Sequence, residues 1–294
     1  MKLKCWVEAM RLRTLPVSTA GVVLACGYAY LYDSFRWVPA LLCFVFALLA
    51  QITSNFANEY YDYKNGSDKR GRVGFRRGVT EGDITPAAMR RAVFATLALA
   101  CVVGCCLIPI GGWWMVPVGA VIAIFALAYS AGPYPLSRLG LGDVAVLVFF
   151  GLVPVCLTFY LQAGFVATDV VCGSVAIGLM GVNVLIVNNY RDCDDDREAG
   201  KRTTVVRFGR KTAAWAYLVF GLAAAALTGP IWDKHRYLVL VPAIYIALHC
   251  GIWEKLRRST GAALNPLLGA TARLMLIYTL MLWAAILLTK LELI

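Results

Sequence analysis

Two clusters of acidic residues carry most of the chemistry that this sequence suggests. One contains Asp192 and Asp196, within twelve positions that hold five acidic and four basic residues and follow an apolar run. The two residues are four apart, so on a helix they share one face. Carboxylates on one face repel each other unless a cation or water lies between them, and such hard oxygen ligands suit Mg²⁺ bound to a diphosphate. A solvated, charged loop explains the same run equally well.

The other cluster repeats this pattern earlier in the chain. Residues 58–62 read NEYYD and residues 188–192 read NNYRD, so each motif has Asn, then Tyr at the third position and Asp at the fifth. A further acid follows each motif, Asp68 in the first case and Asp196 in the second. Asp68 lies six residues beyond its motif and cannot share a helix face with the motif's aspartate, but Gly66 offers the break that lets it fold back. Two carboxylate pairs on one side of a membrane are suited to chelating two Mg²⁺ ions around one diphosphate.

The composition indicates that membrane-spanning helices position these clusters. Of the 294 residues, 60% are hydrophobic and only 15% are charged, against about 25% charged in a soluble domain. The charges are clumped, and they leave apolar runs of roughly 17–25 residues, the length that spans a bilayer. In such a protein the net charge of +11 reflects topology and anionic headgroups, so it does not indicate nucleic-acid binding. We predict an all-α polytopic membrane protein that forms one domain over residues 1–294, in contact with membrane lipid and with no nucleic-acid partner.

The apolar runs predict a bundle of nine transmembrane helices behind a basic, amphipathic N-terminal segment. Both acidic clusters then fall where a helix enters a hydrophilic loop, the loops being residues 62–86 and 191–211. The approximate ranges of the nine helices are 17–32, 37–61, 88–107, 113–131, 144–162, 170–190, 212–227, 237–254 and 271–289.

Lysine and arginine counts predict the orientation of the bundle. With the N-terminus in the cytoplasm, 24 of the 28 basic residues fall in the tail and in the loops on the cytoplasmic side, as the positive-inside rule requires. The other four are Arg36, Lys234, Arg236 and Lys290. Both acidic loops then lie together on the cytoplasmic side, which favours one shared site.

Two other classes of membrane protein also carry acidic residues within a bundle. A transporter places them along a pathway across the membrane, whereas here they gather at one end of the spans. A CDP-alcohol phosphotransferase uses Asp clusters with Mg²⁺, but its pattern needs an Asp-Gly dipeptide, and this chain has none. The transporter stays as the lower-ranked alternative.

Four stretches of the sequence resemble the UbiA superfamily of intramembrane aromatic prenyltransferases. The two acidic motifs at the ends of the second and sixth of nine helices are the most specific part of the resemblance. Within the superfamily, the stretches look most like the enzymes that prenylate 1,4-dihydroxy-2-naphthoate in menaquinone biosynthesis. The stretches are RLRTLP at residues 11–16, NEYYDYKNGSD at 58–68 with RRGVTEGDITPAAMRRA behind it, YSAGPYPLSRLGLGD at 129–143, and NNYRDCDDDREAGKRTTVVRFG at 188–209.

The resemblance implies a function and a location. A polyprenyl group would pass from its diphosphate to 1,4-dihydroxy-2-naphthoate with loss of the carboxylate, giving demethylmenaquinone. Mg²⁺ would assist, and the enzyme would lie in a bacterial inner (cell) membrane with its active-site loops in the cytoplasm. The residues alone leave the acceptor open, and 4-hydroxybenzoate and a homogentisate-type ring are the alternatives.

The resemblance also implies a role for particular residues. Glu59 stands where the family often has Asp, and it is either a ligand or a neighbour. Asp194 and Asp195 are expected to point away from the metal. The implied Mg²⁺ ligands, two ions in all, are Asp62, Asp68, Asp192 and Asp196. The implied diphosphate-binding residues are Asn58, Asn188, Arg138, Arg191, Lys201 and Arg202, with Arg138 in the region where relatives often carry Lys.

Overall fold

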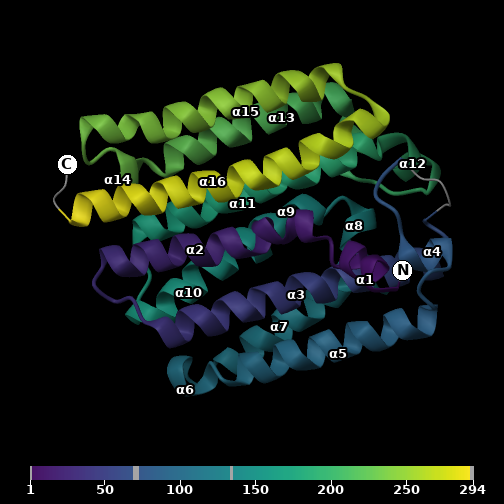
Figure 1. The fold of residues 1–294 in the computed structure, drawn as a ribbon, viewed down its shortest axis with the longest axis horizontal. Helices are drawn as coiled ribbons and strands as arrows, with labels where there is room; N and C mark the ends of the chain where they lie inside the picture. The colour runs from purple at the N-terminus through teal and green to yellow at the C-terminus, as the bar shows by residue number, and fades with distance from the viewer. Residues whose placement is uncertain (1, 69–72, 133–134, 292–294) are drawn as a thin grey trace.

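A computed structural model describes residues 2–68, 73–132 and 135–291 of the chain (Figure 1). Within these residues every regular element is helical, and no strand occurs. Residues 69–72 of the expected loop 62–86 lie outside the described residues, as do Pro133 and Tyr134 of the family-like stretch 129–143.

The described residues contain nine long helical rods, a number compatible with the nine transmembrane helices predicted. Seven of them are long and apolar enough to cross a membrane. Of the other two, α7 is a shorter apolar helix, and α13 carries Arg207, Arg210 and Lys211 in its first two turns. The rods are α2 (Leu15–Leu31), α3 (Trp37–Lys64), α5 (Pro86–Cys105), α7 (Met115–Ala128), the continuous α9–η2–α10 (Gly142–Val146, Leu147–Leu152, Val153–Ala163), α11 (Thr168–Arg191), α13 (Thr204–Leu227), α15 (Leu240–Arg258) and α16 (Asn265–Lys290).

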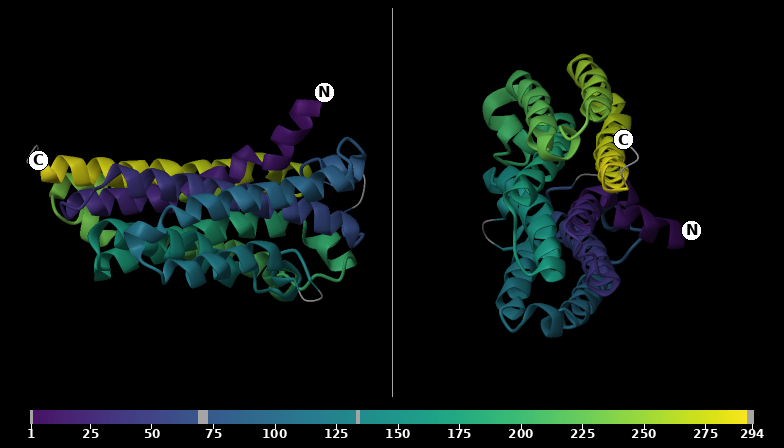
Figure 2. Two further views of the ribbon diagram at one scale, coloured as in Figure 1. Left: turned by 90° about the horizontal axis from the view of Figure 1, so that it is seen from below. Right: turned by 90° about the vertical axis from the view of Figure 1, so that its left-hand side faces the viewer.

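Short helices gather at the ends of the bundle. α4, α8 and α12 lie at the end toward which α3 and α11 run, which we call the loop end (Figure 1). α1 projects from this end of the bundle at an angle to the long helices (Figure 2). It corresponds to the amphipathic segment predicted ahead of the transmembrane helices. The short elements are α1 (Lys2–Met10), η1 (Leu12–Thr14), α4 (Gly78–Glu81), α6 (Ile108–Gly111), α8 (Leu136–Leu139), α12 (Cys193–Glu198), α14 (Gly229–Trp232), η3 (Arg236–Val239) and η4 (Gly261–Leu264).

α11 is the central helix of the fold. It packs against α2, α9–η2–α10, α13 and α16, and most of its residues are buried. Gly151 and Gly178 let η2 approach it closely, since a Cβ added at Gly151 would lie 2.5 Å from the Gly178 Cα. Small residues of this kind are typical of membrane helices in close contact. The packing fixes the end of α11, and therefore the position of the second acidic cluster.

Candidate active site

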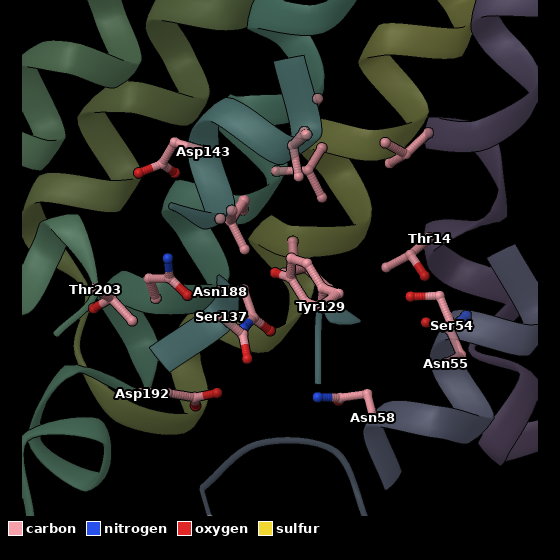
Figure 3. A pocket seen from close by; sticks show the side chains of 18 of the residues that line it. Thr14, Ser54, Asn55, Asn58, Tyr129, Ser137, Asp143, Asn188, Asp192 and Thr203 are labelled. Carbon is pink, nitrogen blue, oxygen red and sulfur yellow. The ribbon is translucent and has the colours of Figure 1, made fainter. Parts of the chain in front are cut away.

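A polar cavity of about 170 Å³ lies among the helix ends at the loop end of the bundle. Asn58 and Asp192 point toward each other across its opening, with Tyr129 farther in (Figure 3). Six of the ten predicted site residues line this cavity: Asn58, Asp62, Asn188, Asp192, Asp196 and Lys201. The structure thus brings residues of the two acidic motifs, more than a hundred positions apart in sequence, to one chamber.

The first motif forms a polar network at the end of α3. Asn58 Nδ2 donates to Asp62 Oδ2 at 2.9 Å, one helical turn along α3. Arg77 then bridges the cluster, with its Nε 3.2 Å from Asp68 Oδ2 and its Nη2 3.8 Å from Asp62 Oδ2. Gly66 has φ of 66°, so the chain does turn back after α3. Asp68 itself does not line the cavity; it meets Asp62 through the guanidinium of Arg77.

The second motif lies at a break between two helices. The sequence predicts one helix carrying both Asp192 and Asp196, and this is wrong: α11 ends at Arg191, and Asp192, with φ −89° and ψ 6°, separates it from α12. One helical bond survives the break, since the Asp196 N–H donates to the Asp192 carbonyl at 2.8 Å. Both side chains are buried and line the cavity. Asp194 and Asp195 are exposed, in agreement with the prediction that they point away.

Arg191 lies behind the cavity wall and holds Asp192. Its Nε and Nη2 are each 2.7 Å from one oxygen of the Asp192 carboxylate, and both side chains are almost fully buried. The same guanidinium donates to Asn188 Oδ1 at 2.9 Å and to Asn265 Oδ1 at 3.0 Å. The family resemblance implies that Arg191 binds the diphosphate. In the structure its guanidinium binds Asp192, Asn188 and Asn265, so it fixes the orientation of Asp192 and Asn188.

Lys201 is the cation that reaches the second cluster from the cavity side. Its Nζ lies 3.0 Å from Asp196 Oδ1, and Gly200, with φ of 70°, lets the chain turn to bring it there. Burial alone would lower the pKa of the Lys201 ammonium, but the carboxylates of Asp62 and Asp196 outweigh burial and raise it above its usual value. A protonated lysine is therefore available between the two motifs.

Arg138 and Arg202 tie the loops together outside the cavity. Arg138 Nη2 donates to Ser67 Oγ at 2.9 Å and to the Ala199 carbonyl at 3.3 Å. The Arg202 N–H donates to the Arg138 carbonyl at 2.8 Å. In this geometry Arg138 links the loop after α3 to the loop after α12.

Glu59 is a neighbour of the site. It is 1% exposed and accepts the Val79 N–H at 3.0 Å, which anchors α4. It does not line the polar cavity.

The site contains residues that the motif analysis did not assign. Arg11 donates to Asn58 Oδ1 and lines the cavity, as does Arg77. Both belong to stretches that resemble the family, RLRTLP and RRGVTEGD. Their positive charge, opposite to that of the acidic motifs, was the sequence signal that could have identified them as site residues. Tyr129 also lines the cavity; burial, then the nearby Asp143, raises the pKa of its phenol, which is therefore neutral.

An apolar cavity of about 360 Å³ adjoins the polar one. Gln51, Ser54, Tyr129 and Phe150 line both. The apolar cavity runs along α7, and side chains of that helix line the cavity. Only Met115 of α7 is buried, because the helix faces this space where it would otherwise pack against a neighbouring helix. A side chain at Gly119 would find open space within 4 Å. The polar chamber therefore continues into a space suited to a hydrocarbon chain.

The donor set of the polar cavity fits Mg²⁺ held together with a diphosphate. Three buried carboxylates reach it, and five carboxamides line it, those of Gln51, Asn55, Asn58, Asn188 and Asn189. All of these side chains offer oxygen ligands. Among the described residues no group of three His, Cys, Asp or Glu side chains stands close enough to hold a metal unaided. Mg²⁺ commonly binds in this way, through one or two carboxylates with water and substrate phosphate oxygens filling its other positions.

Comparison with known proteins places the chain among the UbiA prenyltransferases. The sequence model of the UbiA prenyltransferase family matches residues 19–280. The 1,4-dihydroxy-2-naphthoate octaprenyltransferase of Escherichia coli (strain K12) is 38% identical over 218 residues, 72% of this chain and 71% of that protein. The protein of the same name from Mycobacterium tuberculosis is 34% identical over 276 residues, 94% of each chain.

Solved structures share the fold. A UbiA homolog from Archaeoglobus fulgidus, bound to GPP and Mg²⁺, superimposes with a TM-score of 0.67 at 15% identity, covering 95% of this chain and 99% of that one. The apo structure of a UbiA homolog from Aeropyrum pernix K1 gives 0.67 at 16% identity, covering 95% and 97%. At such identities the likeness concerns the fold alone.

Proposed function

Because the chain belongs to the UbiA prenyltransferase family, we propose that it transfers a polyprenyl group from a prenyl diphosphate to 1,4-dihydroxy-2-naphthoate. The carboxylate is lost as carbon dioxide, and the product is demethylmenaquinol, the hydroquinone form of demethylmenaquinone. The observation that carries the proposal is one polar chamber, lined by both acidic motifs, that opens into an apolar cavity. The two chambers match the two ends of a prenyl diphosphate. The names of the relatives at 32–38% identity supply the acceptor.

The carboxylates and cations of the polar chamber bind the diphosphate end. We assign Asp62 to one Mg²⁺ and Asp192 and Asp196 to a second. Asp68 lies outside the chamber and holds Arg77 beside Asp62. When bound, these ions neutralise the charge that grows on the departing diphosphate. Lys201 faces the same chamber and adds positive charge at the leaving group.

Several residues act by holding others in place. Arg191 fixes Asp192, and Arg138 ties the two loops together. Asn58 is bonded to Asp62 and to Ser130 at 2.9 and 3.1 Å, so it orients the first carboxylate. Precise positioning of charged groups is what electrostatic catalysis requires, because groups that need not reorganise during the reaction stabilise charge best.

The apolar cavity receives the prenyl chain and keeps water from the reacting carbon. Its walls are hydrocarbon side chains from α3, α5, α7 and α10. An allylic cation formed at the junction of the chambers meets the acceptor ring instead of water. Carbon–carbon bond formation at the ring then replaces the bond to the diphosphate, and loss of carbon dioxide returns the ring to its aromatic state.

The protein is an integral membrane protein, and we place its loop end in the cytoplasm. The support is the charge bias of the sequence, with most lysines and arginines on that side. A cysteine at position 195, on the exposed face of α12, should react with a membrane-impermeant maleimide only from the cytoplasmic side. Labelling from the opposite side alone would reverse the orientation.

The function is tested with the protein reconstituted in lipid vesicles. Labelled geranylgeranyl diphosphate and 1,4-dihydroxy-2-naphthoate should give a prenylated, decarboxylated product when Mg²⁺ is present, and none when it is chelated. A parallel reaction with 4-hydroxybenzoate checks the acceptor. Product from 4-hydroxybenzoate alone would reassign the acceptor, and no product from any aromatic acceptor would refute the proposal.

A further inference from the structure

Among the described residues, a buried amide oxygen at the junction of the two cavities has no hydrogen-bond partner. Gln51 lines both the polar and the apolar cavity. Within the described part of the chain, no group donates to its Oε1, although that atom is buried. A buried acceptor without a donor is costly, so this oxygen calls for a ligand that donates a hydrogen bond.

A chain of hydrogen bonds determines which atom of the Gln51 amide has no partner. Asn55 Nδ2 donates to the Met10 carbonyl at 2.9 Å, and a carbonyl can only accept. The Asn55 oxygen is therefore the atom that faces Gln51, and it accepts from Gln51 Nε2 at 3.1 Å. Since Nε2 is used in this bond, Oε1 is the atom that remains. The backbone of α1 thus sets the orientation of an amide three turns inside α3.

The position of Gln51 along α3 suits the reacting end of the substrates. Gln51 precedes Asp62 by eleven residues, about 16 Å along the helix axis, with Ser54, Asn55 and Asn58 on the intervening turns. Ser54 and Asn55 lie on the wall opposite Asn188 and Asp192 (Figure 3). A diphosphate at Asp62 occupies the first part of this distance, which leaves the part near Gln51 and Ser54 for the reacting carbon and a ring.

Only one of the two substrates can satisfy the Gln51 oxygen. A metal-bound prenyl diphosphate has phosphate oxygens and a hydrocarbon chain, and neither offers an O–H or N–H. The aromatic acceptor has hydroxyl groups on its ring, and a hydroxyl donates readily. We propose that Gln51 recognises a ring hydroxyl of the aromatic acceptor through Oε1 and so determines which acceptors are used. The proposal rests on the proposed function, since it requires that a hydroxylated ring binds here.

The test compares acceptors that differ by one hydroxyl. The wild-type protein and the Gln51→Met variant are assayed with 1,4-dihydroxy-2-naphthoate, 1-hydroxy-2-naphthoate and 4-hydroxy-2-naphthoate. The wild type should prefer the dihydroxy compound over one of the two analogues by about 10- to 100-fold in kcat/KM, the effect of an unpaired buried acceptor. Gln51→Met should lose that preference, while the KM for the prenyl diphosphate stays unchanged. The analogue that shows the effect identifies the hydroxyl.

Matched variants separate recognition from a loss of folding. Gln162→Met removes a buried glutamine on α10 that lies outside both cavities, and it should keep the wild-type preference. Gln51→Glu, neutral when buried, retains an acceptor oxygen and should keep much of the preference at mildly acidic pH.

The outcomes distinguish this proposal from the proposed function. If the wild type prenylates no naphthoate, the function itself fails. If the wild type is active and Gln51→Met keeps the same preference among the three acceptors, or if its KM for the prenyl diphosphate rises instead, Gln51 does not recognise the acceptor.

Discussion

Replacement of Arg191 by methionine tests whether this residue serves the protein or the substrate. In the structure Arg191 makes two 2.7 Å contacts to Asp192, and the two side chains are 2% and 4% exposed. Removing one partner of such a buried pair leaves an uncompensated charge, which costs about 3–5 kcal/mol. The Arg191→Met variant should therefore be destabilised by roughly that amount before any substrate is added.

The measurement is denaturant unfolding of the purified protein without and with Mg²⁺. Mg²⁺ should stabilise Arg191→Met more than it stabilises the wild type, because the cation replaces the lost positive charge beside Asp192. Arg191→Lys keeps the charge but loses the two-pronged geometry, so its stability should fall between the two.

The control is Arg197→Met, which removes a partner of Asp194. Those two side chains are 60% and 64% exposed, and an exposed pair contributes at most about 1 kcal/mol. The reasoning would be refuted if Arg191→Met unfolded like the wild type and showed only a raised KM for the prenyl diphosphate. That result would return Arg191 to the role of a diphosphate ligand.

Three further predictions concern the chambers. Asp192→Ala should abolish turnover in a protein that still inserts but is destabilised, because Arg191 loses its partner. Asp194→Ala should retain activity, and comparable rates for both variants in a product assay would contradict the metal assignment. The raised pKa of Lys201 means that its pairing with Asp196 is fully present below the usual lysine pKa, about 10.4, and is lost only as pH rises above the higher folded value. The free energy of unfolding, measured from pH 7 to 9, should therefore show no loss that depends on this pair. If the difference in stability between the wild type and Lys201→Met vanished within that range, the pairing of Lys201 with Asp196 would be contradicted. Gly119→Leu should fill part of the apolar cavity and reduce kcat/KM for a geranylgeranyl donor more than for a geranyl donor, as a competition assay with both would measure; equal loss for both would show that the chain lies elsewhere.

The sequence was sufficient for features that depend on local spacing. Apolar runs predicted the rods, and the shared spacing of Asn and Asp in the two motifs singled out Asn58 and Asp62, which are hydrogen-bonded in the structure. Gly66 predicted the turn that brings Asp68 back. In each case the interaction joins residues close in sequence, so helical periodicity and glycine geometry are enough to foresee it.

Features that depend on the return of a distant segment could not be foreseen in this way. Arg77 reaches Asp62 and Asp68 only because the loop folds over the end of α3. The equivalent asparagine of the second motif, Asn188, bonds to Arg191 instead of to its aspartate. The break at Asp192 has a similar origin, because tertiary packing around Arg191 outweighs the helical preference of a run without glycine or proline.

The directions of α3 and α11 bear on the order in which ligands arrive. Both helices run toward the loop end, and each finishes at an acidic motif, with Asp62 in the last turn of α3 and Asp192 directly after α11. The C-terminal end of a helix carries partial negative charge, so the peptide dipoles add to the field of the carboxylates. Sites built for bare anions use the opposite end of a helix. The two helix ends therefore favour a divalent cation, whereas a diphosphate depends on that metal and on Arg11, Arg77 and Lys201, which line the same cavity.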